Sequence, residues 1–313
     1  MQYPVPNPLV VIVGPTAVGK SRIAVEVARL LDGEIVSADS RLFYRRMDIG
    51  TAKPSIEDRR FINHHLIDIA EPDEIIGLRV FQLKTQSSIK KILNINKLPI
   101  LVGGTGQYIH AITEGWTIPP QKPDEKLRAL LYDWADEIGS TEIHQKLVLL
   151  DPIAAETIDS RNVRRTIRAL EVILGTGKPF SLQRSRVGTK YDLKMIGLSL
   201  PREMLYQRID ERIDQMITDG LIEEVKNLLS KGYSPDLPSM SAIGYHEISD
   251  YLQNKITCEE AIMLMKRRTR QFVRRQANWF KTNDPHIHWF AISERIVEEI
   301  IEFIQSTNDW ITE

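Results

Sequence analysis

Gly14-Pro-Thr-Ala-Val-Gly-Lys-Ser21 decides the fold of this 313-residue chain. The stretch matches the pattern G-x-x-x-x-G-K-[ST], in which glycines let the backbone curl so that successive N–H groups point at a phosphate. An apolar run at residues 9–13 predicts a buried parallel strand before it, and residues 20–31 predict a helix after it. The helix N-terminus adds partial positive charge and Lys20 adds a cation. We therefore predict a phosphate-binding loop made of Gly14, Pro15, Thr16, Ala17, Val18, Gly19, Lys20 and Ser21, with Ser21 as a ligand for Mg²⁺.

Strand and helix signals alternate on both sides of this loop. Further strands are expected at residues 34–37, 98–102, 194–200 and 286–292, with a weaker candidate at 66–69, and further helices at 78–93 and 294–305. This rhythm implies a parallel sheet with helices on both faces. The predicted fold class is α/β, with a P-loop NTPase-like parallel sheet core flanked by helices and a helical insertion domain.

The middle of the chain has a different pattern. Residues 116–122 are rich in proline, and the residues that follow, up to about 171, show helical signals without a clear strand. We therefore expect the helical insertion domain at residues 117–194. The core then consists of residues 1–116 and 195–313, and its C-terminal part is mostly helical.

Composition limits the classes of protein that this chain can represent. Hydrophobic residues make up 42% and charged residues 27% of it, which excludes a wholly disordered protein. No run approaches the ~18 consecutive apolar residues of a membrane helix, so we expect no membrane partner. The single cysteine, Cys258, excludes an internal disulfide, argues against a cysteine-based zinc site and fits a cytoplasmic location. The net charge of −1 argues against general nucleic-acid binding, although a sum hides where the charges lie.

Two local clusters are basic without an intervening acid. One holds Arg161, Arg164, Arg165 and Arg168, and the other holds Lys266, Arg267, Arg268, Arg270, Arg274, Arg275 and Lys281 in one predicted helix. A solvated charged face is the usual explanation of such a cluster. The second cluster, however, has no anion of its own that could neutralise it. We therefore expect this helix to follow the phosphates of a nucleic acid.

Two more segments follow predicted strands, where ligands of open α/β sheets bind. Asp39, in Ser37-Ala-Asp-Ser40, is a candidate magnesium ligand, general base or turn-capping residue. The strand at 98–102 ends in Gly103-Gly-Thr-Gly106, not in the aspartate with which an NTP hydrolase holds its metal. This turn is either a plain tight turn or a place where a substrate approaches closely, with Thr105 as a hydroxyl donor.

In this order, the motifs resemble those of the tRNA dimethylallyltransferase family (isopentenyl-diphosphate:tRNA transferases). The matching stretches span residues 9 to 281 and are Gly14–Ser21, Ser37–Ser40, Tyr44, Met47–Pro54, His65–Asp68, Gly103–Gly106 with Tyr108, Arg164–Glu171, Leu205–Arg212, Ala242–Glu247, Thr269–Gln271, Arg275–Gln276 and Trp279–Phe280. The chain departs from the family at Leu42, where Gln is usual, at Gln107, where an apolar residue is usual, and at His246, where Lys or Arg is usual.

The resemblance implies a reaction as well as a fold. A dimethylallyl group would pass from dimethylallyl diphosphate to N6 of the adenosine 3′-adjacent to the anticodon, in tRNAs that read codons beginning with U. Asp39 is the expected general base, while Thr16, Lys20, Ser21 and Mg²⁺ stabilise the leaving diphosphate. Arg208 and Arg212, on one face of a predicted helix, are candidates for a further cation, and a salt-bridged surface face is the alternative.

The expected partner is the anticodon stem-loop of tRNA, bound by a monomer whose insertion domain contacts the RNA. Its expected contacts are Asp39, Ser40, Arg41, Leu42, Thr105, Arg164, Arg165, Arg168, Ser241, Ala242, Ile243, Gly244, Tyr245, Arg270, Gln271, Arg274, Arg275 and Gln276. Tyr245 is either a base-stacking or a core aromatic residue. An unpaired loop base costs less to extract than a duplex base.

Other functions remain open on the sequence alone. A dimethylallyltransferase that uses free AMP or ATP has a similar phosphate loop, but it needs neither a helical insertion nor an arginine-rich helix. A P-loop nucleotide kinase would require an arginine-rich lid and ATP. A non-catalytic RNA-binding protein would have no use for an intact Lys20, Ser21 and Asp39.

Overall fold

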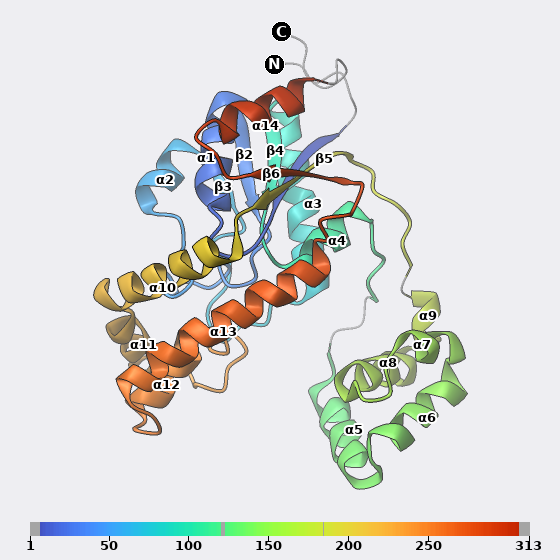
Figure 1. Cartoon of the computed structure of the whole chain (residues 1–313). Coiled ribbons are helices and arrows are strands. Elements are labelled where there is room, and N and C mark those ends of the chain that lie inside the picture. The colour runs from blue at the N-terminus through green and yellow to red at the C-terminus, as the bar shows by residue number, and fades with distance from the viewer. Residues whose placement is uncertain (1–6, 120–122, 184, 307–313) are drawn as a thin grey trace. The chain divides into compact units, whose positions relative to one another are not determined.

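A six-stranded sheet carries the phosphate loop. The computed structural model describes residues 7–119, 123–183 and 185–306, and in it all strand pairs are parallel. The strand order is β3-β2-β4-β1-β5-β6. The strands are β1 (Pro8–Val13), β2 (Gly33–Ser37), β3 (His64–His65), β4 (Leu98–Val102), β5 (Asp192–Ser199) and β6 (Ile287–Ala291) (Figure 1). The predicted parallel α/β sheet is thereby confirmed.

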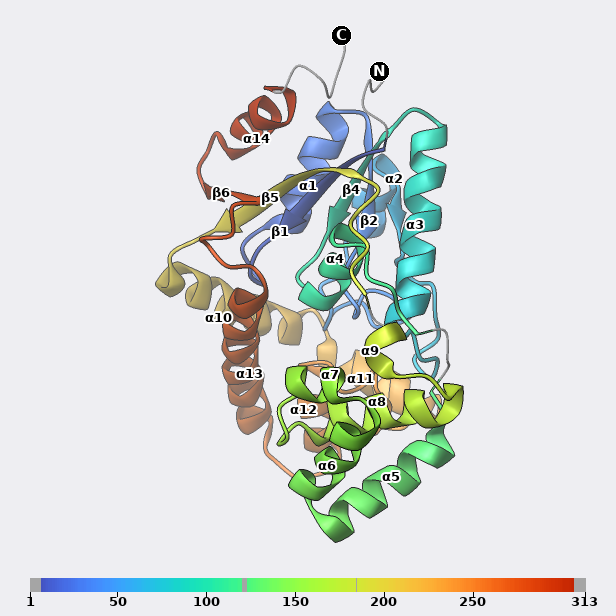
Figure 2. The same cartoon turned by 90° about the vertical axis from the view of Figure 1, so that its right-hand side faces the viewer.

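Strand β1 lies inside the sheet and is buried on both faces. Its residue Val10 is in register with Ile100 of β4 on one side and with Lys194 of β5 on the other. Helices α1 (Lys20–Leu30) and α14 (Ile296–Gln305) pack together, as do α3 (Leu78–Asn94) and α4 (Gly106–Thr113), so that the sheet lies between two helical layers (Figure 2). An apolar, β-branched run is the sequence that such a doubly covered strand requires.

One predicted strand was wrong. Residues 66–69 were the weak candidate, but β3 is formed by the two histidines just before them, which pair with Ile35 and Val36. Leu66 has φ 64° and Asp68 has φ 55°, both in the left-handed region. An extended strand cannot continue through such residues, so the apolar composition of this segment misled the prediction.

Four helices follow β5 in the chain and lie near the carboxyl ends of the strands. They are α10 (Arg202–Thr218), α11 (Leu221–Ser230), α12 (Tyr245–Leu252) and α13 (Cys258–Trp279), drawn below the sheet in Figure 1. The long helix α13 packs on α10, α12 and α4. It begins with a capping box in which Thr257 and Glu260 satisfy each other's backbone N–H groups. No helix in the described part of the chain is long and apolar enough to cross a membrane.

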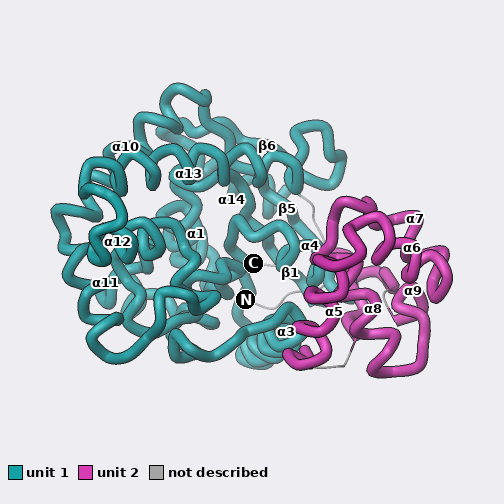
Figure 3. Tube along the Cα trace, turned by 90° about the horizontal axis from the view of Figure 1, so that it is seen from below, with its two compact units in different colours: residues 1–113, 190–313 teal, residues 114–189 magenta. Residues whose placement is uncertain are grey.

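The second compact unit comprises residues 114–189, and the first comprises the rest of the chain (Figure 3). The helices of this second unit are α5 (Glu125–Ile138), α6 (Ser140–Leu150), α7 (Pro152–Thr157), α8 (Val163–Thr176) and α9 (Phe180–Gln183). They enclose a core of their own that includes Leu131, Ile143 and Leu170. The unit ends earlier than the expected limit of 194, because β5 already begins at Asp192.

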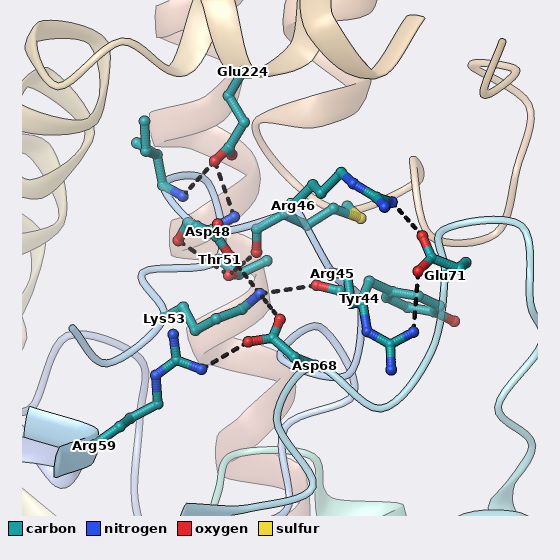
Figure 4. Close-up of polar contacts among 12 residues, drawn as sticks. Tyr44, Arg45, Arg46, Asp48, Thr51, Lys53, Arg59, Asp68, Glu71 and Glu224 are labelled. Atoms are coloured by element: carbon teal, nitrogen blue, oxygen red, sulfur yellow. Dashed lines mark hydrogen bonds and ion pairs between the residues drawn. The ribbon is translucent and has the colours of Figure 1, made fainter. Parts of the chain in front are cut away.

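The segment between β2 and β3 is held by a buried lysine. The side chain of Lys53 is only 2% exposed, and its Nζ donates to the carbonyl oxygen of Tyr44 (2.9 Å) and to Oδ1 of Asp68 (2.6 Å). It also pairs with Asp48, and Arg59 of α2 (Ile56–Phe61) donates to Oδ2 of Asp68 at 2.7 Å (Figure 4). Three chain segments therefore meet at one ammonium group.

A carboxylate from α11 holds the same segment from the other side. Glu224 accepts hydrogen bonds from the backbone N–H groups of Asp48 (3.0 Å) and Ile49 (2.9 Å) (Figure 4). It also accepts one from the backbone N–H of Gly50 (3.2 Å). These bonds join residues 48–50, which belong to the N-terminal half of the sheet core, to the C-terminal helices. The two halves of the first unit are thereby fixed to each other by polar contacts as well as by the core.

We expect Lys53→Met to lower the free energy of unfolding by about 2–3 kcal/mol, because it removes the buried cation that Asp48 and the partly buried Asp68 share and leaves Asp68 with Arg59 alone. Urea unfolding followed by circular dichroism measures this. The matched control is Lys226→Met, which removes only an exposed pair with Glu223 and should cost less than about 0.5 kcal/mol. Equal destabilisation by the two substitutions would contradict the role of Lys53.

The effect of Lys53→Met should also depend on pH. Burial raises the pKa of Asp68, but the hydrogen bonds from Lys53 and Arg59 outweigh burial and hold this pKa below its ordinary value. A carboxylate of this kind contributes stability above its unfolded pKa of about 3.9, and this contribution is lost as the pH falls through the lower folded pKa. The difference between wild type and variant should be full at neutral pH and shrink below about pH 4.

Candidate active site

The phosphate loop curls through backbone conformations that favour glycine. Gly14 has φ 146° and Gly19 has φ 108°, and Ala17 between them has φ 68°. A Cβ on Gly14 would lie 2.7 Å from the carbonyl oxygen of Leu198 in β5, so the loop also passes close to its neighbouring strand. Lys20 begins α1 and folds back over the loop, donating to the carbonyl oxygens of Gly14 (3.0 Å) and Pro15 (2.8 Å).

Cations from two parts of the chain gather at this loop. Arg208 of α10 donates through Nη1 to the carbonyl oxygen of Val18 at 3.3 Å. Burial lowers the pKa of Lys20 to about 8, an effect that Asp39 opposes and Arg212 reinforces. Burial also lowers the pKa of Arg212, and Asp39 again opposes it. Lys20, Arg212 and Asp39 therefore lie within electrostatic reach of one another, in a site where desolvated cations favour an anion.

Asp39 follows β2, but β2 is not the strand beside the loop. Strand β4 lies between β2 and β1, the strand that leads into the loop. The Oδ1 atom of Asp39 accepts from the backbone N–H of Arg41 at 2.9 Å, so this carboxylate does cap a turn. Its Oδ2 atom has no hydrogen-bond partner within residues 7–119, 123–183 and 185–306, and stays available for a second role.

The glycine-rich turn after β4 is filled by the chain itself. A Cβ on Gly103 would lie 2.4 Å from the carbonyl oxygen of Ala38, one on Gly104 would lie 2.1 Å from Nε2 of Gln276, and one on Gly106 would lie 2.1 Å from the ring of Trp279. The close approach at this turn is made by β2 and α13, which favours the plain tight turn of the two alternatives. Thr105 stays partly exposed, and its carbonyl accepts the N–H groups that start α4.

Two of the segments expected to bind RNA lie together. Arg41 donates to the carbonyl oxygens of Pro238 (3.0 Å) and Ser239 (3.3 Å) and to Oγ of Ser241 (3.3 Å). Ser40 and Arg41 are partly exposed and Ser241 is exposed, so they form a polar surface beside Asp39.

Other members of these two segments are buried, which corrects their assignment to RNA. The side chains of Leu42 and Ala242 belong to the core, Gly244 is buried and Ile243 is half-buried. Tyr245 is 0% exposed, and its hydroxyl donates to Glu224 at 2.6 Å. Burial raises the pKa of Tyr245 well above its ordinary value. Tyr245 is thus the core aromatic of the two alternatives, because no base can reach a ring enclosed on all sides.

The cations of α13 divide into two groups. Lys266 pairs with Asp214 (2.6 Å) and Arg270 with Asp210, both on α10, while Arg268 pairs with Glu247 of α12 (2.6 Å). These three are neutralised by neighbouring helices, which corrects the expectation of an unpaired cluster, while the contact of Arg270 with RNA stays a prediction. The exposed cations of the helix with no ion pair in the described part of the chain are Arg267, Arg274 and Arg275, and Gln271 is exposed beside them.

Gln276 does not face solvent, which corrects its assignment to RNA. It is 3% exposed, and its Oε1 accepts from the backbone N–H of Thr16 at 2.8 Å. Sequence reasoning missed this contact, as it missed the roles of Lys53 and Glu224. The partners of Gln276 and Glu224 lie more than a hundred residues away, so no local pattern signals them.

In the second unit, the arginines of α8 also divide. Arg164 and Arg165 are exposed at its first turns. Arg168 instead pairs with Glu171 (2.7 Å), a fully buried carboxylate that also takes Arg128 (2.8 Å). Arg168 therefore helps to hold this unit together, and its contact with RNA stays a prediction. Arg161 is paired with Asp159 at 2.7 Å.

The donor set at the loop fits Mg²⁺ that arrives with a diphosphate. Within residues 7–119, 123–183 and 185–306, no group of three or more His, Cys, Asp or Glu side chains is placed to hold a metal ion. Mg²⁺ in phosphate sites needs only one or two protein oxygens, because substrate phosphates and waters complete its shell. The exposed hydroxyl of Ser21 and the free Oδ2 of Asp39 are oxygens of this kind.

Comparison with known proteins places this geometry in a family. A model of the IPP transferase family matches residues 42–283. The tRNA dimethylallyltransferase of Roseiflexus sp. (strain RS-1) is 48% identical over 274 residues, which cover 88% of this chain and 90% of the relative. The tRNA dimethylallyltransferase of Pelotomaculum thermopropionicum is 47% identical over 301 residues, which cover 94% of this chain and 95% of the relative.

Solved structures agree with these matches. The full-length tRNA isopentenylpyrophosphate transferase of Bacillus halodurans is 41% identical and superposes with a TM-score of 0.72, covering 96% of both chains. A eukaryotic dimethylallyltransferase that acts on tRNA is 26% identical with a TM-score of 0.80, covering 96% of this chain and 79% of that one. Because the family model spans most of the sequence and the relatives match it nearly end to end, this chain belongs to the IPP transferase family.

Proposed function

We propose that this chain is a tRNA dimethylallyltransferase that transfers the dimethylallyl group of dimethylallyl diphosphate to N6 of the adenosine 3′-adjacent to the anticodon. The observation that carries the proposal is the convergence of Asp39, Lys20 and Arg212 at the carboxyl ends of the strands. It places a carboxylate beside a phosphate loop with two half-buried cations. Membership of the IPP transferase family supports the same chemistry.

The reaction joins the prenyl C1 carbon to N6 as the bond from C1 to the diphosphate oxygen breaks. N6 is a poor nucleophile, because its lone pair is delocalised into the adenine ring, so its proton must leave as the new bond forms. Asp39 accepts that proton through its free Oδ2 while Oδ1 stays bonded to the N–H of Arg41. A carboxylate fixed by one oxygen in this way presents the other in a defined direction.

Negative charge develops on the departing diphosphate, which takes the electrons of the broken bond. The loop of residues 14–21 supplies N–H groups and the start of α1, and Lys20, Arg208 and Arg212 supply the cations. Thr16 and Ser21 add hydroxyl groups, and Ser21 would hold a Mg²⁺ ion, which would supply further positive charge to the diphosphate. Because Lys20 and Arg212 are desolvated, their interaction with this charge is stronger than it would be in water.

The RNA is held at two places within the first unit. Ser40, Arg41 and Ser241 lie beside Asp39, where the unpaired adenosine enters, and Thr105 after β4 adds a hydroxyl group. Gln271, Arg274 and Arg275 on α13 bind the phosphates of the strand that leads to it. On the insertion, Arg164 and Arg165 carry the contacts to RNA, because both are exposed.

The acceptor is tested directly by incubating labelled dimethylallyl diphosphate and Mg²⁺ with tRNA, AMP or ATP. We expect label in tRNA alone, at the adenosine next to the anticodon, and loss of labelling when EDTA removes the metal. A tRNA transcript with that adenosine replaced by guanosine is the matched control. Label in AMP or ATP would instead identify a free-nucleotide transferase, and hydrolysis of ATP without transfer would contradict the proposal altogether.

The general base is tested with Asp39→Asn, which keeps an oxygen for the N–H of Arg41 but cannot take a proton. Turnover at saturating substrates should fall ~10²-fold or more, the range for loss of a general base. The affinity for an anticodon stem-loop, measured by fluorescence anisotropy, should change little. If RNA affinity fell while turnover at saturation stayed at the wild-type value, Asp39 would be a recognition residue.

The phosphate-binding face of α13 is tested with Arg274→Ala. The slope of log affinity for the stem-loop against log salt concentration should become shallower by about one charge. Lys90→Ala on α3 removes an equally exposed cation elsewhere and should leave the slope as it is. An unchanged slope for Arg274→Ala would show that this guanidinium touches no phosphate.

A further inference from the structure

Gln276 joins the phosphate loop to the turn after β4. Its Oε1 accepts the backbone N–H of Thr16 at 2.8 Å, and its Nε2 donates to the carbonyl oxygen of Gly104 at 3.1 Å. The side chain comes from α13, more than a hundred residues away from both partners, and it is 3% exposed. One amide therefore satisfies a donor of the loop and an acceptor of the turn at the same time.

The turn is shaped to receive this part of α13. A Cβ on Gly104 would lie 2.1 Å from Nε2 of Gln276, and one on Gly106 would lie 2.1 Å from Trp279. The ring of Trp279 also contacts His110 of α4, with ring centroids 5.5 Å apart. Glycine at positions 104 and 106 thus allows the end of α13 to pack against the active site, and Gln276 makes the polar contact of this packing.

The same stretch of α13 faces RNA on its other side. Arg274 and Arg275 directly precede Gln276 and are exposed, while Gln276 and Val273 are buried. Residues of one helical turn move together, because the backbone hydrogen bonds hold them as a rigid unit. A phosphate that restrains Arg274 or Arg275 therefore also restrains the amide that holds Thr16.

We propose that Gln276 is a positioning residue that sets the phosphate loop and couples RNA binding along α13 to diphosphate binding in the loop. The proposal rests on the proposed function, since it needs both ligands to bind this chain. RNA bound to the exposed face restrains α13 and with it the geometry of the loop, so diphosphate binds more tightly. Coupling between two ligands is reciprocal, so diphosphate raises the affinity for RNA by the same factor.

The test uses inorganic diphosphate with Mg²⁺ as the probe and an anticodon stem-loop as the RNA. Isothermal titration calorimetry gives the affinity for diphosphate with and without RNA, and for RNA with and without diphosphate. In the wild type, each ligand should tighten the other several-fold. In Gln276→Met, which roughly keeps the volume and removes both hydrogen bonds, diphosphate alone should bind roughly tenfold more weakly, because the half-buried N–H of Thr16 and the buried carbonyl of Gly104 lose their partner. The coupling factor should fall to about one.

Gln82→Met is the matched control. Gln82 is also a buried helical glutamine, and its Nε2 donates to the carbonyl oxygen of Ala111 at 3.0 Å. Its loss should lower thermal stability as Gln276→Met does, yet leave both diphosphate affinity and coupling as in the wild type. A merely structural role for Gln276 predicts that the two variants behave alike.

Gly104→Ala perturbs the same contact from the other side, because its Cβ displaces the amide of Gln276. It should reproduce the effects of Gln276→Met, and the double variant should be no worse than the stronger single variant, since both act on one contact. Gly104→Ala also supplies the test if Gln276→Met fails to fold. Additive effects in the double variant would overturn the proposal.

Two outcomes separate this inference from the proposed function. A wild type that binds both ligands with no mutual effect, or a Gln276→Met variant with wild-type coupling, overturns the positioning role and leaves the transferase assignment intact. A wild type that binds diphosphate but no tRNA stem-loop overturns the proposed function itself. Several-fold coupling that only the changes at Gln276 and Gly104 abolish supports the inference.

Discussion

The turn after β1 is the constraint on which the rest of the site depends. Positive φ angles at Gly14, Ala17 and Gly19 bend the chain so that α1 starts beside its own loop and Lys20 folds back over it. This geometry concentrates N–H groups and a desolvated ammonium in one place. The cations of α10 add to that charge, and Asp39 balances part of it. A diphosphate leaving group and a proton acceptor can then share one small volume.

The positively charged side chains of α13 fall into two groups according to the direction in which they point. Cations that face α10 and α12 are neutralised by Asp214, Asp210 and Glu247, and those that face solvent are not. A net charge of −1 is therefore compatible with a basic helix, because acids on neighbouring helices pair with part of its positive charge. The cations of α13 that have no ion pair in the described part of the chain are a short exposed set. A short set favours binding in one register over binding along any polyanion.

The glycines of the turn after β4 allow other segments of the chain to pack closely against it. Gly103 lets β2 end against β4, while Gly104 and Gly106 admit α13. The position of Asp39 and the position of the phosphate loop are thus set from the same turn. The polar network around Lys53 and Glu224 fixes the remaining segment between β2 and β3 in the same unit.

The sequence by itself determined the parallel sheet, the phosphate loop, the catalytic candidates Lys20, Asp39 and Arg212 and the family, because these follow from local patterns and from motifs in a fixed order. Only the tertiary structure decided which residues of those motifs reach solvent. Tyr245, Leu42 and Gln276 are buried and Arg270 is paired, although each stands in a segment that the sequence assigned to RNA binding. The physical reason is that burial and ion pairing are settled by partners far along the chain: Asp210 lies 60 residues from Arg270, and Thr16 lies 260 residues from Gln276.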